Sequence, residues 1–175
     1  MLVHRNPREL APKRVVVMGE NGFVGGAIGK RLSADGTEVL SLGRQEVDLL
    51  SANASEKLAD YLCPGDAFVA VSAMAPAKNG SMVVDNLILS GAMVNALKAR
   101  GDDIVHVVNI SSDAVYADST IPLTESSATA PDSYHGVMHL AREINFQSEL
   151  NIPLAIVRPT LIYGEADPHN GYGPN

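Results

Sequence analysis

Closely spaced glycines are the residues whose pattern indicates chemistry most directly. The segment GENGFVGG places Gly19, Gly22, Gly25 and Gly26 directly after the apolar run Arg14–Met18. Glycine permits a tight strand-to-helix turn and a close approach of the backbone to a pyrophosphate. The N-terminus of the following helix would offer free N–H groups and the positive end of its dipole to phosphates. We therefore favour a dinucleotide site over a tight turn without a ligand.

The end of the second expected strand bears on which dinucleotide binds. The segment SLGRQ places Gly43 and Arg44 there, where an arginine accommodates the extra phosphate of NADP and an acid would hold the ribose of NAD. Arg44 thus favours NADP over NAD, although a solvated surface arginine is the ordinary alternative. Asp48 could accept a hydrogen bond from the adenine amino group, or simply end a strand.

Short apolar runs rich in β-branched residues alternate with stretches of helical spacing. Strands are expected at Arg14–Met18, Glu38–Leu42, Glu46–Leu49, Ala67–Val71, Ile104–Ile110 and Leu154–Val157. Helices are expected at Gly22–Leu32, Ser55–Leu62, Ser81–Arg100 and Ser133–Leu150. This alternation predicts an α/β fold with a doubly wound parallel sheet and helices on both faces. A ligand would lie beyond the carboxyl ends of the strands, where the strand order switches.

Composition narrows the class of protein and of partner. The 175 residues are 46% hydrophobic and 19% charged, which is typical of one folded domain. With 13 basic and 20 acidic residues the net charge is −7, and no basic stripe suggests a nucleic-acid partner. We find no apolar run of about 18 residues and no apolar N-terminal segment, and therefore expect a cytoplasmic protein without a membrane partner.

Five motifs in order carry a resemblance to a known family. They are GENGFVG after the first strand, VSAMA at Val71–Ala75, SSDAVY at Ser111–Tyr116, Tyr134 opening a helix, and RPTLIYG at Arg158–Gly164. The chain resembles the extended short-chain dehydrogenase/reductases, particularly nucleotide-sugar epimerases, dehydratases and reductases. The resemblance implies a Rossmann-type NAD(P)-binding domain over residues 1–175, a nucleotide-sugar substrate and a homodimer. Relatives continue with a smaller substrate domain, which we expect to be absent from this chain.

The resemblance also assigns roles to residues. Ser112 falls on the catalytic serine, which steadies the substrate oxygen, and Tyr134 falls on the tyrosine that exchanges a proton during hydride transfer. The cofactor contacts implied by the resemblance and the glycine loop are Gly19, Gly22, Phe23, Val24, Gly25, Arg44, Asp48, Leu49, Ser72, Ala73, Met74, Tyr134, Met138 and Pro159.

One of these positions departs from the family pattern. A tyrosine with a pKa of about 10 needs help to act near neutral pH, and the family supplies a lysine four residues later. This sequence has Met138, which carries no charge. Three outcomes stay open: His139 or Arg142 substitutes, the chemistry is slower or different, or the protein binds dinucleotide without turnover as a sensor or scaffold. A reductase of a non-sugar carbonyl is a further alternative.

Other polar groups receive weaker interpretations. His135, His139 and Glu143 share a helix face, but without an H-E-x-x-H motif we interpret them as a solvated or loop-facing stripe and predict no metal site. The Tyr134–Met138 face is instead expected to point at the cofactor. Asn86 is expected to tie neighbouring backbone segments together. The side chains expected to face a sugar nucleotide, or to lie in an exposed terminal loop, are Asp167, His169, Asn170 and Tyr172.

Overall fold

The structure is a computed structural model that describes residues 11–164 and 167. Its elements in chain order are β1 (Arg14–Met18), α1 (Phe23–Ala34), β2 (Val39–Leu42), α2 (Ala54–Tyr61), β3 (Asp66–Ala70), α3 (Gly80–Arg100), η1 (Gly101–Asp103), β4 (Ile104–Ile110), η2 (Asp113–Val115), α4 (Tyr134–Glu149) and β5 (Leu154–Val157). All strand pairs are parallel and the order is β2-β1-β3-β4-β5. The predicted Rossmann-type doubly wound sheet is confirmed.

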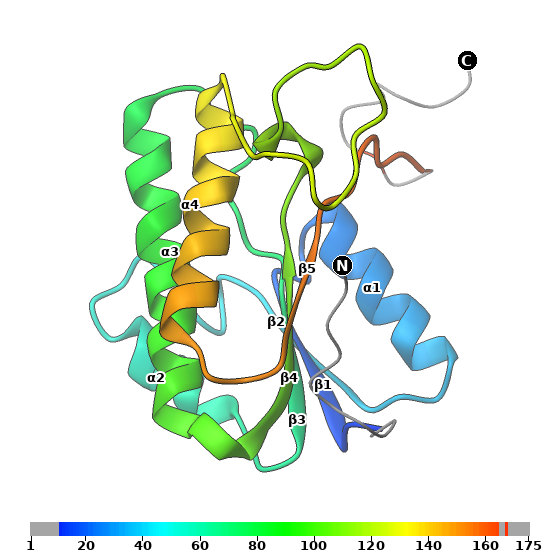
Figure 1. The fold of residues 1–175 in the computed structure, drawn as a ribbon. Coiled ribbons are helices and arrows are strands. Elements are labelled where there is room, and N and C mark those ends of the chain that lie inside the picture. Colours follow the sequence, from blue (N-terminus) through cyan, green and yellow to red (C-terminus); the bar gives the residue numbers. More distant parts are fainter. Residues whose placement is uncertain (1–10, 165–166, 168–175) are drawn as a thin grey trace.

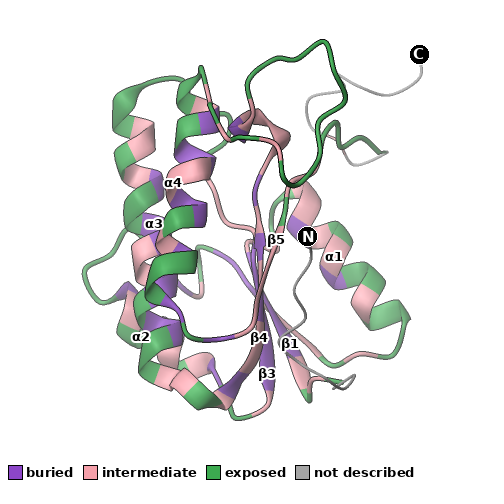
Figure 2. Ribbon diagram, viewed as in Figure 1, coloured by how far each residue is buried: buried purple, intermediate pink, exposed green. Residues whose placement is uncertain are grey.

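The helices cover the two faces of the sheet unequally. Figure 1 shows α2, α3 and α4 on one face and α1 on the other. The larger apolar cluster lies under the three helices and joins sheet residues such as Val16 and Phe68 to Leu97 of α3 and Phe146 of α4. In Figure 2 the strands form the buried centre of the molecule. Burial on both sides explains why the strands appear in the sequence as nearly continuous apolar runs.

The expected strand Glu46–Leu49 is wrong. Val47 N–H donates to the Gly43 carbonyl at 2.9 Å and Ser51 N–H donates to the Asp48 carbonyl at 2.9 Å, so the segment forms two successive turns. The carboxylate of Glu46 accepts from Gly43 N–H at 2.9 Å and closes the first of them. Local hydrogen bonds therefore outweigh the alternation of apolar residues, and the segment becomes a wall of the cavity described below.

Helix α3 is long and apolar. Within Gly80–Asp103, a stretch of 18 residues reaches a mean hydropathy of 1.3, and the helix has the length of a membrane span, which we did not expect from the sequence. In this fold α3 packs between α2 and α4, and its buried side chains include Leu89, Met93 and Leu97. Core helices of globular domains have the same composition, because one side of each is packed against a sheet.

Candidate functional site

A cavity of about 640 Å³ lies beyond the carboxyl ends of the strands, at the switch between β1 and β3. Its walls come from the glycine loop, the turns after β2, the segments after β3, β4 and β5, and the first turns of α4. The predicted residues that line it are Gly19, Gly22, Phe23, Val24, Arg44, Asp48, Leu49, Ser72, Ala73, Met74, Ser112 and Pro159. Residues from five separate stretches of sequence thus meet at the position where doubly wound sheets bind ligands.

The glycine loop can accept a ligand because its backbone is bare. Gly19 has φ +112°, a conformation that favours glycine, and an added Cβ would lie 2.7 Å from the Ser72 nitrogen. A Cβ on Gly25 would lie 2.1 Å from the Gly19 carbonyl oxygen, so Gly25 supports the loop from behind without lining the cavity. No side chain caps α1 at Gly22 and no acid lies in its first turn. This cradle fits a pyrophosphate.

The turns after β2 place opposite charges at the edge of the cavity. Arg44 and Asp48 form an exposed ion pair with a nitrogen–oxygen distance of 3.4 Å, and both residues line the cavity. An exposed pair of this kind contributes little free energy, so a ligand phosphate can compete for the guanidinium. The arrangement suits an adenosine ribose, with or without an extra phosphate, near Arg44.

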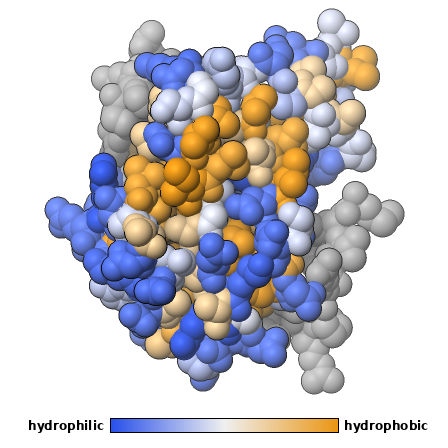
Figure 3. Space-filling model, turned by 90° about the vertical axis from the view of Figure 1, so that its left-hand side faces the viewer, coloured by the Kyte–Doolittle hydropathy of each residue, from blue (hydrophilic) through white to orange (hydrophobic). Residues whose placement is uncertain are grey.

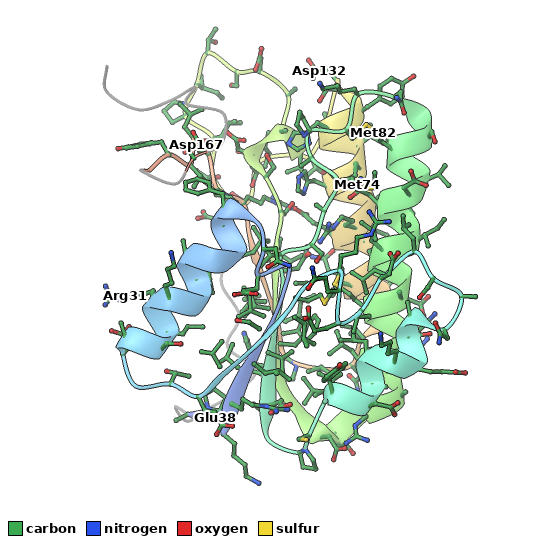
Figure 4. All side chains as sticks on the ribbon, turned by 180° about the vertical axis from the view of Figure 1, so that it is seen from behind. Arg31, Glu38, Met74, Met82, Asp132 and Asp167 are labelled. Atoms are coloured by element: carbon green, nitrogen blue, oxygen red, sulfur yellow. The ribbon has the colours of Figure 1, made fainter. Side chains whose placement is uncertain are left out.

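Two helices hold the segment that follows β3. The side-chain oxygen of Asn86 accepts from Met74 N–H at 2.9 Å, and its amide donates to the Met74 and Met82 carbonyls at 3.1 and 2.7 Å. The prediction that Asn86 ties backbone segments together is confirmed. From α4, Arg142 Nη1 donates to the Ser72 carbonyl at 2.6 Å. Figure 4 shows Met74 and Met82 close together beside the first turns of α3.

The structure corrects the face of α4 that meets the cavity. Tyr134 is 55% exposed and Met138 is 0% exposed, and neither lines the cavity, whereas His135 and His139 both do. The residues of α4 that line the cavity thus lie one position, or about 100° of rotation around the helix, from the Tyr134–Met138 face that we expected to meet the cofactor. Of the two interpretations of the histidine stripe, solvated or loop-facing, the solvated one is wrong, because His139 is only 6% exposed.

Contacts at both ends of α4 fix this orientation. Ser133 Oγ accepts from Gly136 N–H at 3.1 Å and caps the helix. A Cβ on Gly136 would lie 2.0 Å from the Ala114 carbonyl oxygen, so the first turn is pressed against η2. Farther along the same side, Glu143 contacts Ser111 of the β4 end, and Phe146 packs in the core. The N-terminal part of the same side of α4, which carries His135 and His139, therefore faces the cavity.

The two histidines form a pair at this end of the cavity. Their rings lie edge to face, with centroids 4.6 Å apart, and the Nδ1 atoms of both are buried without a hydrogen-bond partner in the described part of the chain. Burial lowers the pKa of His135, and the charge of Asp113 partly opposes this. Burial, with Arg142 and His135, lowers the pKa of His139 to about 3. Both imidazoles are neutral near pH 7.

The charge that the resemblance expects beside the tyrosine is not supplied by either predicted substitute. His139 is neutral for the reasons just given. Arg142 is fully buried beside α4, where burial lowers its pKa to about 10, and it contacts Ser72 and Asn109 without lining the cavity. It remains charged near pH 7, but its role in the fold is to hold the segment after β3.

A hydrogen-bonded network supports the serines at the end of β4. Ser112 Oγ accepts from Ala114 N–H at 3.1 Å and donates to Asp113 at 3.2 Å. Below it, the buried carboxylate of Glu143 accepts from Ser111 and, at 2.6 and 2.9 Å, from two nitrogens of Arg158. This carboxylate raises the pKa of Arg158, and the guanidinium also donates to the Tyr116 hydroxyl.

Sequence reasoning missed the cavity-lining residues Ser111, His135 and His139. The sequence did contain a signal for the two histidines. One side of the helix carries, at helical spacing, His135, His139, Glu143 and Phe146, and the apolar Phe146 indicates that this side faces the sheet. Among the described residues, no group of three or more His, Cys, Asp or Glu side chains could hold a metal. His169, Asn170 and Tyr172 lie outside the described residues, whereas Asp167 is described and half-buried.

Comparison with protein-family models decides the family. The model of the NAD dependent epimerase/dehydratase family matches residues 15–174. The chain belongs to this family. Comparison with curated proteins found no match.

Solved structures of related fold include enzymes with either dinucleotide. UDP-N-acetylglucosamine 4-epimerase from Bacillus cereus is 25% identical with a TM-score of 0.72, and the match covers 83% of this chain and 54% of that one. A dTDP-4-dehydrorhamnose reductase from Bacillus anthracis in complex with NADP is 21% identical with a TM-score of 0.76, covering 96% and 58%. A UDP-glucuronic acid 4-epimerase from Bacillus cereus in complex with NAD is 18% identical with a TM-score of 0.69, covering 86% and 57%. The chain thus spans a little over half the length of these relatives.

Proposed function

We propose that this chain is the dinucleotide-binding part of a cytoplasmic NAD(P)-dependent enzyme that acts on a nucleotide sugar. The observation that carries the proposal is the cradle at Gly19, Gly22 and Gly25, where bare backbone meets the uncapped N-terminus of α1 at the edge of the cavity. The family to which the chain belongs and the nucleotide-sugar enzymes of similar fold support the substrate class.

Within this proposal NADP is preferred over NAD. Arg44 lines the cavity after β2, and its weak pair with Asp48 leaves the guanidinium available to a phosphate. A charge-assisted bond of this type contributes about 1.5–3 kcal/mol, which corresponds to roughly a tenfold to hundredfold difference in affinity. NAD would lack this contact, whereas the remaining contacts of the cavity serve both dinucleotides.

Ser112 is the residue of this chain that we propose to steady the substrate oxygen. Its hydroxyl lies at the end of β4, lines the cavity and is oriented by Ala114 N–H and the Asp113 carboxylate. A bound nicotinamide would exchange a hydride with the sugar carbon beside this hydroxyl. A serine hydroxyl that donates a hydrogen bond to the oxygen of that carbon stabilises the charge that develops there.

Calorimetric titration of NADPH and NADH into the purified chain tests the cofactor assignment. We expect NADPH to bind more tightly, and we expect Arg44→Ala to remove that preference while leaving NADH binding within about twofold. Arg31→Ala is a matched control, because Arg31 is equally exposed and also pairs with an aspartate four residues later. Failure of both cofactors to bind at millimolar concentration would contradict the proposal.

The competing function is an NAD(P)-binding sensor or scaffold without turnover. Its support is the departure from the tyrosine and lysine pattern at α4, where the side chains that face the cavity are histidines. Absorbance at 340 nm separates the two functions for a net reduction or oxidation. Because an epimerase returns the hydride to its substrate, product analysis by chromatography is needed with nucleotide sugars. Cofactor binding with no product from any nucleotide sugar would favour the sensor.

We also propose that two copies pair through the outer faces of α3 and α4. Figure 3 shows apolar side chains gathered on the side of the molecule where these helices lie. The exposed large apolar residues of the two helices are Val84, Leu87, Ile88, Val137 and Ile144. A continuous apolar patch of this kind is typical of a protein–protein interface. Sedimentation of the purified protein as a monomer would contradict the pairing.

A further inference from the structure

The hydride transfer proposed above needs a group that takes the proton of the carbinol hydroxyl. Tyr134 is 55% exposed and does not line the cavity, so we look for another group to do this. At the end of the cavity formed by β4 and α4, the imidazoles among the lining side chains are those of His135 and His139. The question is therefore which imidazole meets the substrate.

We propose that His135 is the acid–base residue of this site and that His139 is a positioning residue behind it. His135 lies in the first turn of α4, half-buried and open to the cavity, whereas His139 is one turn deeper and 6% exposed. The edge-to-face contact between the rings holds His135 from one side. Gly136, pressed against the Ala114 carbonyl, holds the same turn from the other.

The groups around His135 suit a proton acceptor. Asp113 of η2 partly offsets the effect of burial on its pKa, which stays below 6.5, so the imidazole is neutral and able to accept a proton at pH 7. His139 faces it from the same helix and is neutral, with Arg142 one further turn away as the charged group that lowers the pKa of His139. His139 itself titrates too low to hold a transferred proton near neutral pH.

A histidine in this role removes the need for the lysine of the family pattern. A tyrosine has an ordinary pKa of about 10, so it needs a neighbouring cation to act as a base near neutral pH. An imidazole has an ordinary pKa of about 6.5 and needs no such cation. A histidine at position 135 can therefore work beside a neutral residue at position 139, one turn later.

The chemical step balances with the residues named. As the C–H bond of the carbinol breaks, two electrons leave as a hydride to the oxidised nicotinamide, and the O–H proton passes to the free imidazole nitrogen of His135. A C=O bond forms, and the hydroxyl of Ser112 donates to its oxygen. In the reverse direction the His135 imidazolium returns the proton to that oxygen.

Chemical modification tests the assignment without a known substrate. Diethyl pyrocarbonate acylates neutral, accessible imidazoles, and peptide mass spectrometry can follow each histidine with and without saturating NADP⁺. We expect bound NADP⁺ to slow modification of His135 at least fivefold and to leave His106, which does not line the cavity, unchanged. Binding of NADP⁺ without protection of His135 would overturn the histidine assignment alone. Absence of NADP⁺ binding would overturn the cofactor proposal as well.

Turnover of UDP-glucose, UDP-N-acetylglucosamine and dTDP-glucose provides the second test. We expect His135→Gln to lower kcat at least a hundredfold, and Tyr134→Phe to keep activity within about twofold. The double change His135→Tyr with His139→Lys should restore turnover to within about tenfold, because it recreates a tyrosine and a lysine one turn apart on the face that meets the cavity. Loss of activity in Tyr134→Phe but not in His135→Gln would overturn the proposal.

Discussion

Glu143 is the residue whose alteration should most clearly expose the buried network beneath the site. It is 1% exposed and accepts hydrogen bonds from Ser111 and from two nitrogens of Arg158. Glu143→Gln keeps the shape of the side chain but removes its charge. In either orientation of the new amide, its NH₂ group faces an N–H of Arg158 and leaves that donor without an acceptor.

The expected loss follows from that geometry. Removal of one partner of a buried ion pair lowers the free energy of unfolding by about 3–5 kcal/mol. Because the glutamine oxygen still accepts one hydrogen bond from Arg158, we expect a loss near the lower limit, about 3 kcal/mol. With a urea m-value of about 1–3 kcal/mol/M, the midpoint of unfolding should fall by about 1–3 M. Because domains of this size have about 5–15 kcal/mol of stability, the variant should still fold.

Glu149→Gln is the matched control for this urea measurement. Glu149 lies on the same helix and pairs with Lys98 at 2.6 Å, but both side chains are about half exposed. Solvent screening and the unfavourable position of an acid at a helix C-terminus predict no resolvable change. Adding Arg158→Met to Glu143→Gln should recover part of the loss, because the unpaired guanidinium is then gone. Equal midpoints for the two glutamine variants would refute the reasoning.

Three further outcomes are expected. Gly25→Ala should weaken dinucleotide binding at least tenfold in calorimetry because its Cβ would collide with the Gly19 carbonyl, whereas Gly91→Ala, with nothing within 4 Å of the new Cβ, should not. Between pH 7 and 5 the unfolded chain takes up a proton at His139, whereas the folded chain does not. The free energy of unfolding, measured by urea titration, should therefore fall by about 2 kcal/mol between these two pH values, and His139→Gln should reduce this pH dependence. Ile88→Glu should shift sedimentation from dimer toward monomer, and an unchanged coefficient would contradict the proposed interface.

Much of the fold and the cofactor cradle could be predicted from the sequence, because their determinants are local. Buried parallel strands need apolar β-branched runs, and a glycine-rich turn between strand and helix has few other uses. The bounds of β1, β4 and β5 were accordingly predicted to the residue. The conformation of Glu46–Leu49 was not predicted, because the hydrogen bonds of Gly43 with the Glu46 carboxylate and with Val47 N–H form a turn that alternation alone does not reveal.

Only the tertiary structure decided which face of α4 meets the cavity. Helical periodicity shows which residues share a face of the helix, but not which face meets the cavity. A rotation of the helix by one residue would place Tyr134 where His135 now lines the cavity. That rotation is set by contacts distant in the sequence, namely Gly136 against Ala114 and Glu143 against Arg158. The protonation of His139 is likewise a property of its burial rather than of its residue type. The sequence by itself therefore determined that a dinucleotide-binding fold was present, and packing determined which side chains its cavity presents to a substrate.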